Sequence, residues 1–504
     1  MATMTPTARP SELLLPSEMA EADRRAIAAG PDNGMELMRS AGQAVADTVL
    51  SRFPGRRVDV LCGPGNNGGD GYVVAERLSR GGMDVAVYAA GRPREGTDAA
   101  TAAAESEVPV QPLAAYAPRV DAVVVDALYG AGLDRPLDDT TLGVVARTRA
   151  AANPVVAVDL PSGLSGATGQ RLGDAFDAAV TVTFARLKPG HLLEPGRTAC
   201  GDLVLADIGI SDAVIDSLAV ATFENVPRLW RDRLPRPARD VHKYSRGHVM
   251  VLSGGPSATG AARLSAMAAA RAGAGAVTLL SPADAVAVNA AHLTSIMLRE
   301  VDTIDDILSA FETRRASAIV YGPGLSDDVE TAHRLIRLLH EAQPCPPTVV
   351  DASALTALGR DRALLKPPAA GWRCGLVLTP HAAEFARLFP DLDATAVPSK
   401  LVRARSAASR SQAVIVYKGP DTVIAAPDGR AAINGNGTPL LATAGSGDVL
   451  SGIIAGLLAQ GMPPFEAACA AVWMHAEAAG RFGHGLIAED LPLALRPVLC
   501  ELLD

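Results

Sequence analysis

Two series in which short apolar strands alternate with helical stretches constrain the fold of this chain most strongly. The first series predicts strands at 58–62, 84–88, 121–126, 155–159 and 179–184. The second predicts strands at 248–252, 276–280, 318–321, 348–351, 375–378, 413–417 and 422–425. Strands that alternate with helices pair in parallel, and the helices cover both faces of the sheet. We therefore expect an α/β protein with two three-layer αβα domains.

A segment rich in proline and arginine separates the two series. With 504 residues, the chain exceeds the size at which one hydrophobic core usually stops growing. The alternation dissolves between 208 and 247, where prolines interrupt any regular element. We expect a first domain at 1–225, a linker at 226–240 and a second domain at 241–504. Two helices are expected within 16–50, and helices at 448–460 and 464–480 close the second series.

Composition excludes several classes of protein. The net charge of −9 is the wrong sign for a general nucleic-acid binder or a ligand of anionic membranes. The six cysteines are far apart and form no C-x-x-C pair, so neither a disulfide framework nor a cysteine metal site is expected. The most apolar window, 449–458, is too short to cross a bilayer. A reducing cytoplasm is the simplest setting.

Polar loops follow three strands of the first series. The stretch at 63–71 is Gly-Pro-Gly-Asn-Asn-Gly-Gly-Asp-Gly, while Asp126 and Asp159 end the strands that come later. The glycine pattern formally fits a dinucleotide loop, but 87–90 lacks the acid that would bind a ribose, which disfavours a redox site. Carboxylates and amides at one sheet edge can hold a hard cation or a polar ligand. The alternative is a tight turn at 63–71 and two ordinary strand-end caps.

The stretch at 445–448, Gly-Ser-Gly-Asp, enters an apolar helix in the second series. A helix start offers unpaired N–H groups and a partial positive charge, so a glycine loop there can hold a phosphate group. Asp448 would stand beside that phosphate as a base, and Lys418-Gly419 would contact a nucleotide. No Walker motif is present. The alternatives are an N-capped helix at 445–448, a surface lysine in a turn at 418, and a helix-capping role for His381.

These motifs resemble two enzyme families. The stretches at 63–71, 126–132 and 158–163 are similar to the NAD(P)H-hydrate epimerase family, over residues 11–220. The stretches at 242–243, 247–255, 321–325, 378–381, 418–419 and 437–452 are similar to the ADP/ATP-dependent NAD(P)H-hydrate dehydratase family, over residues 235–504. The resemblance implies a Rossmann-like first domain and a ribokinase-like second domain. The whole chain resembles the bifunctional NAD(P)H-hydrate repair enzymes.

The resemblance implies that the first domain interconverts the R and S hydrates of NADH and NADPH. It implies Asp159 as the acid/base residue and a potassium site at Asn67, Asp126 and Ser162. The hydrate contacts that it implies are Asn66, Asn67, Gly68, Gly69, Asp70, Gly130, Ala131, Gly132, Leu133, Asp134, Arg135 and Pro136.

For the second domain, the resemblance implies phosphorylation of the hydroxyl of the S hydrate, followed by phosphate elimination. Asp448 would be the base, and Mg²⁺ would enter with ADP or ATP. The implied hydrate contacts are Ala261, Gly324 and His381. The implied nucleotide contacts are Lys418, Gly419, Pro420, Asp421, Thr422, Gly445, Ser446 and Gly447.

Two alternatives remain open at this point. The second domain could be a ribokinase-like small-molecule kinase whose product keeps its phosphate, because that class shares the glycine loop. The first domain could be a non-catalytic binding or scaffold module. We expect small-molecule substrates, NADH and NADPH hydrates with ADP or ATP, no nucleic-acid or membrane partner, and a homo-oligomer in the cytoplasm.

Overall fold

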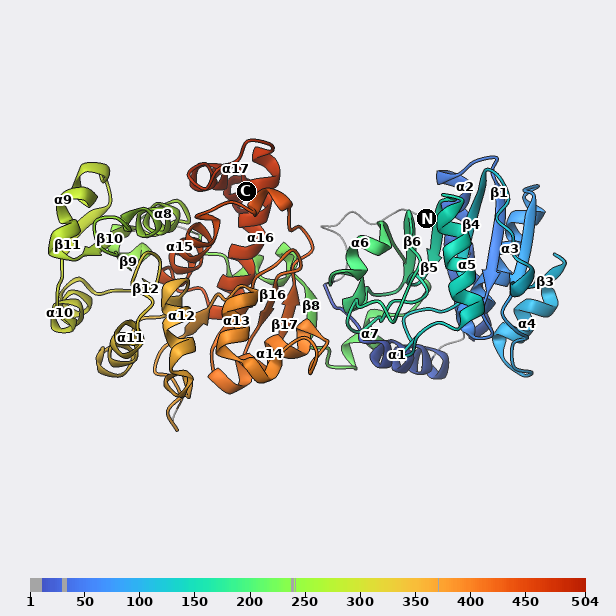
Figure 1. Ribbon diagram of the computed structural model, residues 1–504, viewed down its shortest axis with the longest axis horizontal. Coiled ribbons are helices and arrows are strands. Elements are labelled where there is room, and N and C mark those ends of the chain that lie inside the picture. The colour runs from blue at the N-terminus through green and yellow to red at the C-terminus, as the bar shows by residue number, and fades with distance from the viewer. Residues whose placement is uncertain (1–10, 30–33, 237–239, 241, 370) are drawn as a thin grey trace. The chain divides into compact units, whose positions relative to one another are not determined.

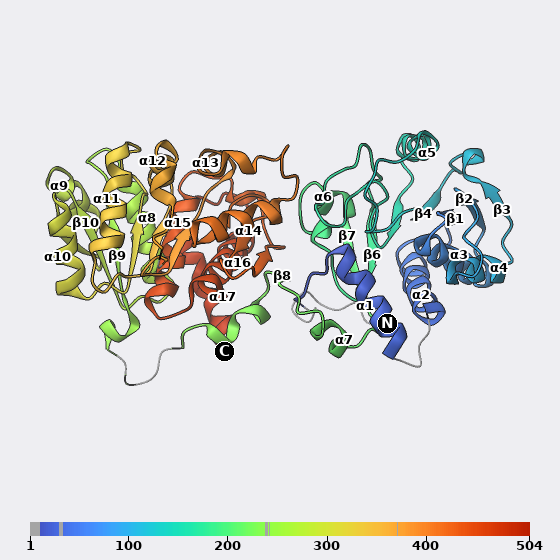
Figure 2. The same cartoon turned by 90° about the horizontal axis from the view of Figure 1, so that it is seen from below.

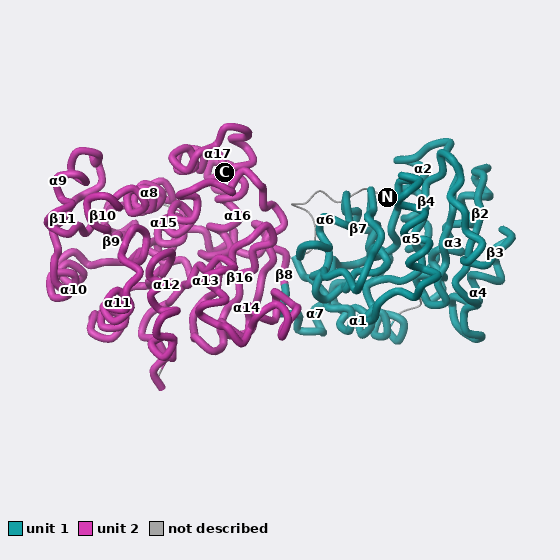
Figure 3. Tube along the Cα trace, in the orientation of Figure 1, with its two compact units in different colours: residues 1–222 teal, residues 223–504 magenta. Residues whose placement is uncertain are grey.

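The chain forms two compact units, Met1–Thr222 and Phe223–Asp504 (Figure 3). The computed structural model describes residues 11–29, 34–236, 240, 242–369 and 371–504. The sequence also predicts a loose tail at 1–10, and these residues lie outside the described parts. Each unit contains a largely parallel sheet between helices, so the expected α/β class with two three-layer domains is confirmed.

The chain passes between the units earlier than the expected linker at 226–240. The residues after Thr222 pack into the second unit, where the Trp230 side chain is only 1% exposed. Its Nε1 donates to Asn225 Oδ1 at 3.1 Å, and Asn225 Nδ2 donates to Asn434 Oδ1 at 3.0 Å. Pro227 begins a short 3-10 helix that ends at Leu229, and the tryptophan that follows is stabilised by burial. Residues 237–239 of the expected linker lie outside the described parts.

The first unit has a seven-stranded parallel sheet in the order β3-β2-β1-β4-β5-β6-β7 (Figure 1). The strands are β1 (Arg57–Cys62), β2 (Val85–Ala89), β3 (Val110–Pro112), β4 (Ala122–Ala127), β5 (Val155–Val158), β6 (Val180–Phe184) and β7 (Asp202–Ala206). All five expected strands are present. The two edge strands, β3 and β7, were not predicted, because their exposed residues break the apolar run that marks a strand buried on both faces.

Helices cover both faces of this sheet. Val58 and Val60 of β1 belong to the core beneath α1 (Pro16–Ala29), α2 (Gly34–Arg52), α3 (Asn66–Arg80) and α4 (Asp98–Glu105). Leu61 of β1 points to the other face, where it joins a second core with Val144 of α5 (Asp139–Ala150). Two short helices, α6 (Gly196–Cys200) and α7 (Asp212–Asp216), follow later in the chain.

The second unit has a ten-stranded sheet in the order β11-β10-β9-β12-β13-β14-β15-β16-β17-β8. The strands are β8 (Thr222–Glu224), β9 (His248–Leu252), β10 (Ala276–Ser281), β11 (Met297–Glu300), β12 (Ala318–Tyr321), β13 (Thr348–Val350), β14 (Leu376–Leu378), β15 (Val414–Tyr417), β16 (Val423–Ala425) and β17 (Ala431–Ile433). Pairing is parallel from β11 to β15 and antiparallel through β16 and β17. All seven expected strands are present, whereas β8, β11 and β17 were not predicted.

The helices of the second unit also lie on both faces of the sheet (Figure 2). One face packs against α8 (Thr259–Arg271), α15 (Ser446–Ala459), α16 (Pro464–Phe482) and α17 (Leu491–Leu503). The remaining helices are α9 (Ala283–His292), α10 (Ile304–Arg314), α11 (Val329–Glu341), α12 (Ser353–Arg360), α13 (Ala382–Leu388) and α14 (Lys400–Ser411). Helix α17 corrects the expectation that α16 ends the chain.

Glycines set the distance between α8 and α15. A Cβ on Gly452 would lie 2.1 Å from the carbonyl oxygen of Ser265, and one on Gly456 would lie 2.7 Å from that of Ala269. The two helices therefore pack with their backbones in close contact, and this contact fixes the start of α15 at one edge of the sheet. No helix in the described parts of the chain combines the length and apolar character that a bilayer crossing demands.

Candidate active sites

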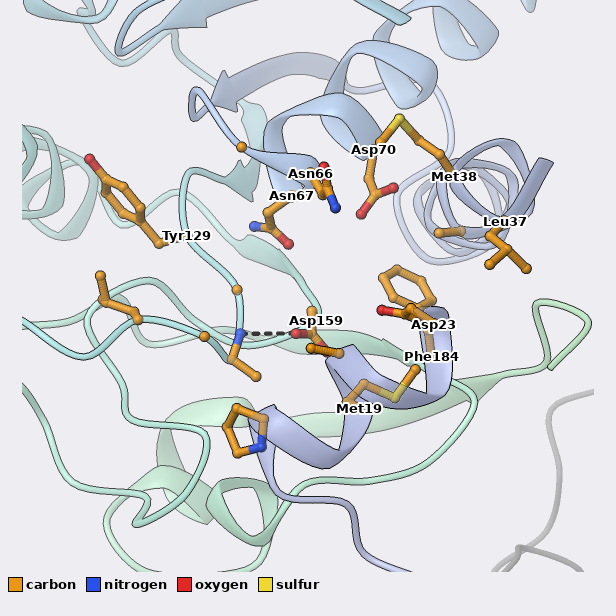
Figure 4. A pocket seen from close by; sticks show the side chains of 18 of the residues that line it. Met19, Asp23, Leu37, Met38, Asn66, Asn67, Asp70, Tyr129, Asp159 and Phe184 are labelled. Carbon is orange, nitrogen blue, oxygen red and sulfur yellow. Dashed lines mark hydrogen bonds between the residues drawn. The ribbon is translucent and has the colours of Figure 1, made fainter. Parts of the chain in front are cut away.

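A cavity of about 610 Å³ lies at the carboxyl ends of β1, β4 and β5 in the first unit (Figure 4). Its volume falls in the range typical of small-molecule sites. It is lined by loop residues from 64–65 and 128–135, by Asn66 and Asn67 at the start of α3, and by Asp159. Helices α1 and α2 contribute Met19, Asp23, Leu37 and Met38.

Most of the sequence-predicted contacts of this unit line the cavity together. They are Asn66, Asn67, Asp70, Gly130, Ala131, Gly132, Leu133, Asp134, Arg135 and Asp159. Gly68, Gly69 and Pro136 are not among the lining residues. Instead, a Cβ on Gly68 would lie 1.8 Å from the carbonyl oxygen of Gly63, and one on Gly69 would lie 2.6 Å from Met38. These two glycines allow close packing of α3. The apolar pattern of the sequence predicts a helix only over 72–80, but α3 begins at Asn66, inside the glycine-rich stretch.

Asp159 is held in a strained backbone conformation at the end of β5. Its φ is +65°, in the left-handed region that a non-glycine residue seldom adopts. The side chain of His191 supports this turn, because its Nε2 lies 2.7 Å from the carbonyl oxygen of Asp159 while its Nδ1 accepts from the Lys188 amide at 2.9 Å. Burial lowers the pKa of His191 to about 4, so the ring is neutral and Nε2 is the donor.

The carboxylate of Asp159 is fully satisfied by nearby donors. Oδ1 accepts from Lys188 Nζ at 2.8 Å and from Thr183 Oγ1 at 2.9 Å, and Oδ2 accepts from the Ala131 amide at 2.9 Å. Burial alone would raise the pKa of Asp159, but the charges of Lys188 and the hydrogen bonds hold it below its ordinary value. Asp159 is therefore an anion at neutral pH, and Lys188, only 2% exposed, is its counter-ion.

Asp126 and Ser162 form one buried polar cluster beside Asp159. Ser162 donates through its amide to Asp126 Oδ2 at 2.7 Å and through Oγ to Asp126 Oδ1 at 2.7 Å. Ser162 Oγ also accepts from the Tyr129 amide at 2.8 Å. Burial raises the pKa of Asp126 to about 6. Asn67 lies at the cavity wall, and its buried Nδ2 has no hydrogen-bond partner within the described residues.

Two carboxyl groups that were not predicted as a pair face the same cavity. Asp23 comes from α1 and Asp70 from α3, and Figure 4 shows both side chains pointing inward. Burial and the charge of Asp159 raise the pKa of Asp23 to about 6, and Lys188 opposes this rise. Burial, Asp159 and Asp23 raise the pKa of Asp70 well above its ordinary value. Sequence reasoning missed Asp23 and Lys188, because neither is part of a loop motif.

In the second unit, Lys418 and Asp351 form an ion pair beside the glycine loop. Lys418 Nζ lies 2.8 Å from Asp351 Oδ1, and Ser451 Oγ donates to Asp351 Oδ2 at 2.6 Å. A Cβ on Gly447 would lie 3.4 Å from Lys418 Nζ, so the loop and the lysine are in contact range. Asp351 follows β13, and its position at a strand end was a signal that sequence reasoning did not use.

Asp448 lies in the first turn of α15, next to this ion pair. Burial and the charge of Asp351 raise its pKa to about 6, and Lys418 opposes the rise. Glu384 is a third acid near Lys418: burial lowers the pKa of this lysine, but Asp351, Glu384 and Asp448 raise it above its ordinary value. Within the described residues, no group of three or more His, Cys, Asp or Glu side chains is arranged to hold a metal ion.

The helix that carries Asp448 begins earlier than expected. It starts at Ser446, after Gly445 in the left-handed region at φ +88°, and no side chain caps it. A Cβ on Gly445 would lie 2.8 Å from Leu264 and 3.0 Å from Ala488, so a larger residue would displace the loop. The simple N-cap interpretation therefore does not describe this helix start. Its first N–H groups are free of intrahelical partners and point out of the helix end.

The sequence-predicted hydrate contacts of the second unit lie in two places. Gly324 packs against α8, since a Cβ on it would lie 3.7 Å from that of Ala261. His381 caps α13, where its Nδ1 accepts from the Ala383 amide at 3.1 Å, and its side chain remains half exposed. A cavity of about 210 Å³ borders Leu325 and Ser326, immediately after Gly324.

Hydrogen bonds of its own side chains hold the turn at 418–422 in place. Asp421 is buried, and its Oδ1 accepts from Lys400 Nζ at 2.5 Å, so its carboxylate positions the turn. Thr422 Oγ1 donates to the carbonyl oxygen of Gly419 at 2.8 Å. Pro420 lies between them. The structure thus brings Lys418, Gly419 and Gly447 together, while Asp421 faces α14.

Comparisons with known proteins assign the two halves separately. A model described as YjeF-related protein N-terminus matches residues 34–190, and one described as NAD(P)H-hydrate dehydratase matches residues 249–495. The bifunctional NAD(P)H-hydrate repair enzyme of Moorella thermoacetica is 37% identical over 96% of this chain and 96% of its own length. That of Escherichia coli is 33% identical over 92% of this chain and 89% of its own length. A solved ADP/ATP-dependent NAD(P)H-hydrate dehydratase from Bacillus subtilis, co-crystallized with ATP/Mg²⁺, is 28% identical over 55% of this chain and 98% of its own, with a TM-score of 0.48.

Proposed function

The chain belongs to the family of bifunctional NAD(P)H-hydrate repair enzymes, and on this premise we propose how its residues carry out the two reactions. The first unit epimerises the R and S hydrates, and the second dehydrates the S hydrate with a nucleotide. The observation that supports this division is the difference between the sites. The first is a cavity lined by the carboxyl groups of five aspartates, and the second is a glycine loop at a helix start beside Lys418.

The chemistry of the hydrate defines what the first site must do. Water adds to the enamine of a dihydronicotinamide with the proton on the outer carbon and the hydroxyl on the carbon bonded to nitrogen. The product is a hemiaminal, and its epimers interconvert when the ring opens to an aldehyde and closes on the other face. Opening removes a proton from the hydroxyl, breaks the carbon–nitrogen bond and adds a proton to nitrogen. Such proton transfers are what positioned side chains accelerate.

Asp159 is proposed as the acid/base residue that exchanges the hydroxyl proton. Its carboxylate lies in the cavity wall and is ionised, so it can accept that proton. The contacts that orient the hydrate would be the lining residues of 66–70 and 130–135. Gly130 leaves room for the ligand here, because a Cβ on it would lie 3.0 Å from both Asn67 Oδ1 and Asp159 Oδ2.

Potassium is proposed at Asn67, Asp126 and Ser162. The side chains fit such an ion, since each offers an oxygen and Asp126 adds a negative charge. Asn67 Nδ2 has no partner within the described residues, so this donor is available to a polar ligand, whereas the ion would be held by Asn67 Oδ1. When bound, the ion would supply a fixed positive charge at the base of the cavity.

Asp448 is proposed as the base of the second unit. It takes the proton of the hydroxyl of the S hydrate, and the oxygen attacks the terminal phosphoryl group of the nucleotide. Phosphate then leaves with the electron pair of the carbon–oxygen bond, while the lone pair of the ring nitrogen forms a double bond to that carbon. The neighbouring C–H proton passes to water, and its electron pair restores the carbon–carbon double bond and the nitrogen lone pair. Lys418 and the N–H groups of 445–448 would stabilise charge on the phosphoryl group. Asp351 and Glu384 are acids that could hold Mg²⁺ once the nucleotide brings it, where it would neutralise phosphate charge.

The decisive experiment supplies each epimer separately to the full chain with ATP or ADP. We expect the S hydrate to regain the absorbance of the dihydronicotinamide with wild type and with Asp159→Ala, but not with Asp448→Asn. The R hydrate should be repaired at enzymatic rate only by wild type. A stable phosphorylated product would establish the kinase alternative, and equal repair of the R hydrate by Asp159→Ala would contradict the role of that residue. The homo-oligomer and the cytoplasmic location remain proposals that light scattering and fractionation can test.

A further inference from the structure

Three carboxyl groups from separate elements converge on the cavity of the first unit. Asp23 belongs to α1, Asp70 to α3, and Asp159 follows β5 (Figure 4). Only Asp159 has a counter-ion, Lys188 at 2.8 Å. Within the described residues, neither Asp23 nor Asp70 makes an ion pair or a side-chain hydrogen bond. Two unpaired acids facing one small-molecule cavity are costly for a fold, which makes a role in the reaction the better explanation.

The surroundings of these three carboxyl groups shift their pKa values in different directions. Lys188 keeps Asp159 ionised. Asp70 has its pKa raised well above the ordinary value by burial, by Asp159 and by Asp23. Burial and Asp159 bring the pKa of Asp23 to about 6. A group that titrates close to the working pH both gives and regains a proton readily, and Asp23 is only partly buried, so water can reach it.

The epimerisation requires proton transfer at two atoms, the hydroxyl oxygen and the ring nitrogen. Asp159 can serve only one of them at a time, because Lys188, Thr183 and the Ala131 amide hold its carboxylate in one place. A second group must therefore deliver the other proton from a different element. Helix α1 supplies such a group at the cavity wall.

We propose that Asp23 is a second catalytic residue of the epimerisation, which donates a proton to the ring nitrogen while Asp159 takes the proton of the hydroxyl. The carbon–nitrogen bond breaks with its electron pair on nitrogen, and the carbon becomes an aldehyde. After rotation about the adjacent carbon–carbon bond, Asp159 returns its proton to oxygen, Asp23 regains the nitrogen proton, and the ring closes. No proton is gained or lost overall. This inference rests on the proposed epimerase function of the first unit.

Other charged groups surround Asp23, both in the cavity and on the helix that packs against α1. Those that line the same cavity are Asp70, Asp98, Asp134, Arg135, Asp159 and Lys188. Helix α7, which packs against α1, carries Asp212 and Asp216, and both are exposed. Asp212 pairs with Arg186 at 2.6 Å. Among the acids that line the cavity, Asp23 combines a pKa near neutrality with partial access to solvent.

The test measures the exchange of R and S hydrates by the full chain, followed by NMR without nucleotide. Asp23→Asn keeps the size of the side chain but cannot transfer a proton, and we expect kcat to fall by ~10²-fold or more with little change in KM. The wild-type rate should decline as the pH rises above about 6, in proportion to the protonated fraction of Asp23. Asp23→Glu should retain this decline and part of the rate. Glu21→Gln, on the same helix but outside the cavity, is the matched control and should leave the rate unchanged.

The outcomes separate this proposal from the function on which it rests. If the wild-type chain does not exchange the epimers, the proposed epimerase function itself is wrong. A wild-type chain that exchanges them, with a folded Asp23→Asn variant of equal rate and equal pH profile, overturns the role of Asp23 alone. Should Asp23→Asn fail to fold, Asp23→Ser makes the same chemical change with a smaller side chain, and an unchanged rate in that variant overturns the proposal equally.

Discussion

Lys418 Nζ lies 2.8 Å from Asp351 Oδ1, and this ion pair stands between the turn at 418–422 and the start of α15. The Asp351 side chain is 2% exposed and that of Lys418 is 20% exposed. Burial at this depth makes each charge depend on the other, because a lone charge would remain poorly solvated. The pair therefore joins the turn at 418–422 to the glycine loop.

Replacing one member of this pair should destabilise the second unit. Lys418→Met leaves the Asp351 carboxylate buried without a counter-charge, and we expect a loss of about 3–5 kcal/mol in the free energy of unfolding. Calorimetry of the full chain measures the effect. Lys418→Met combined with Asp351→Asn should recover most of the stability but no dehydratase activity. Lys366→Met, at an exposed lysine, is the control and should change stability by less than about 0.5 kcal/mol. An equally small effect of Lys418→Met would contradict the buried pair.

The dehydratase should lose activity in acid as Asp448 becomes protonated. Burial and the charge of Asp351 raise the pKa of this carboxyl to about 6, above its ordinary value. A base works only when ionised, so kcat/KM should be constant above this pH and fall as the pH drops through about 6. Lys418 lowers the pKa of Asp448, so removing its charge should move the midpoint to higher pH. A profile that stays flat down to the ordinary range of a carboxyl would assign the base to another residue.

Close packing of α15 on α8 gives a prediction about helix glycines. A Cβ on Gly452 would meet the carbonyl oxygen of Ser265 at 2.1 Å, so Gly452→Ala should destabilise the second unit by about 1–3 kcal/mol through overpacking. Gly480→Ala is the matched control, because this glycine of α16 has nothing within 4 Å of its Cβ position. It should stabilise the helix by about 0.5–1 kcal/mol. Denaturant unfolding compares the two, and changes of the same sign would refute the packing argument.

The strands buried on both faces were predictable from the sequence, because they need a continuous apolar run. The edge strands β3 and β7 were not, since the three residues of β3 are all exposed and β7 begins at the exposed Asp202 with only its last two residues buried. The starts of α3 and α15 were placed too late for another reason. Glycine is a poor helix former, yet in both places it lies inside the first turn. A Cβ on Gly68 would lie 1.8 Å from the carbonyl oxygen of Gly63, whereas one on Gly447 would make only an ordinary contact, 3.4 Å from Lys418 Nζ.

The candidate site residues also divide into those that the sequence could predict and those that it could not. Asp126, Asp159 and Asp448 could be found because strand ends and helix starts meet ligands in α/β sheets. Asp23 and Lys188 could not, since an acid in an amphipathic helix and a lysine in a loop are ordinarily exposed. Their position at the cavity depends on how α1 and the chain after β6 fold over the sheet edge. Tertiary contacts of this kind leave no local pattern in the sequence.

Gly130 gives a prediction that separates binding from folding in the first unit. Gly130→Ala places a Cβ 3.0 Å from Asn67 Oδ1 and from Asp159 Oδ2, in the space where the hydrate would lie, while the backbone there needs no glycine. We expect epimerisation to fall at least tenfold, chiefly through KM, with less than about 1 kcal/mol change in stability. Gly91→Ala, whose Cβ meets nothing within 4 Å, is the control. Dehydration of the S hydrate should be unchanged in both variants. If Gly130→Ala instead epimerises at the wild-type rate, the hydrate does not bind between Asn67 and Asp159.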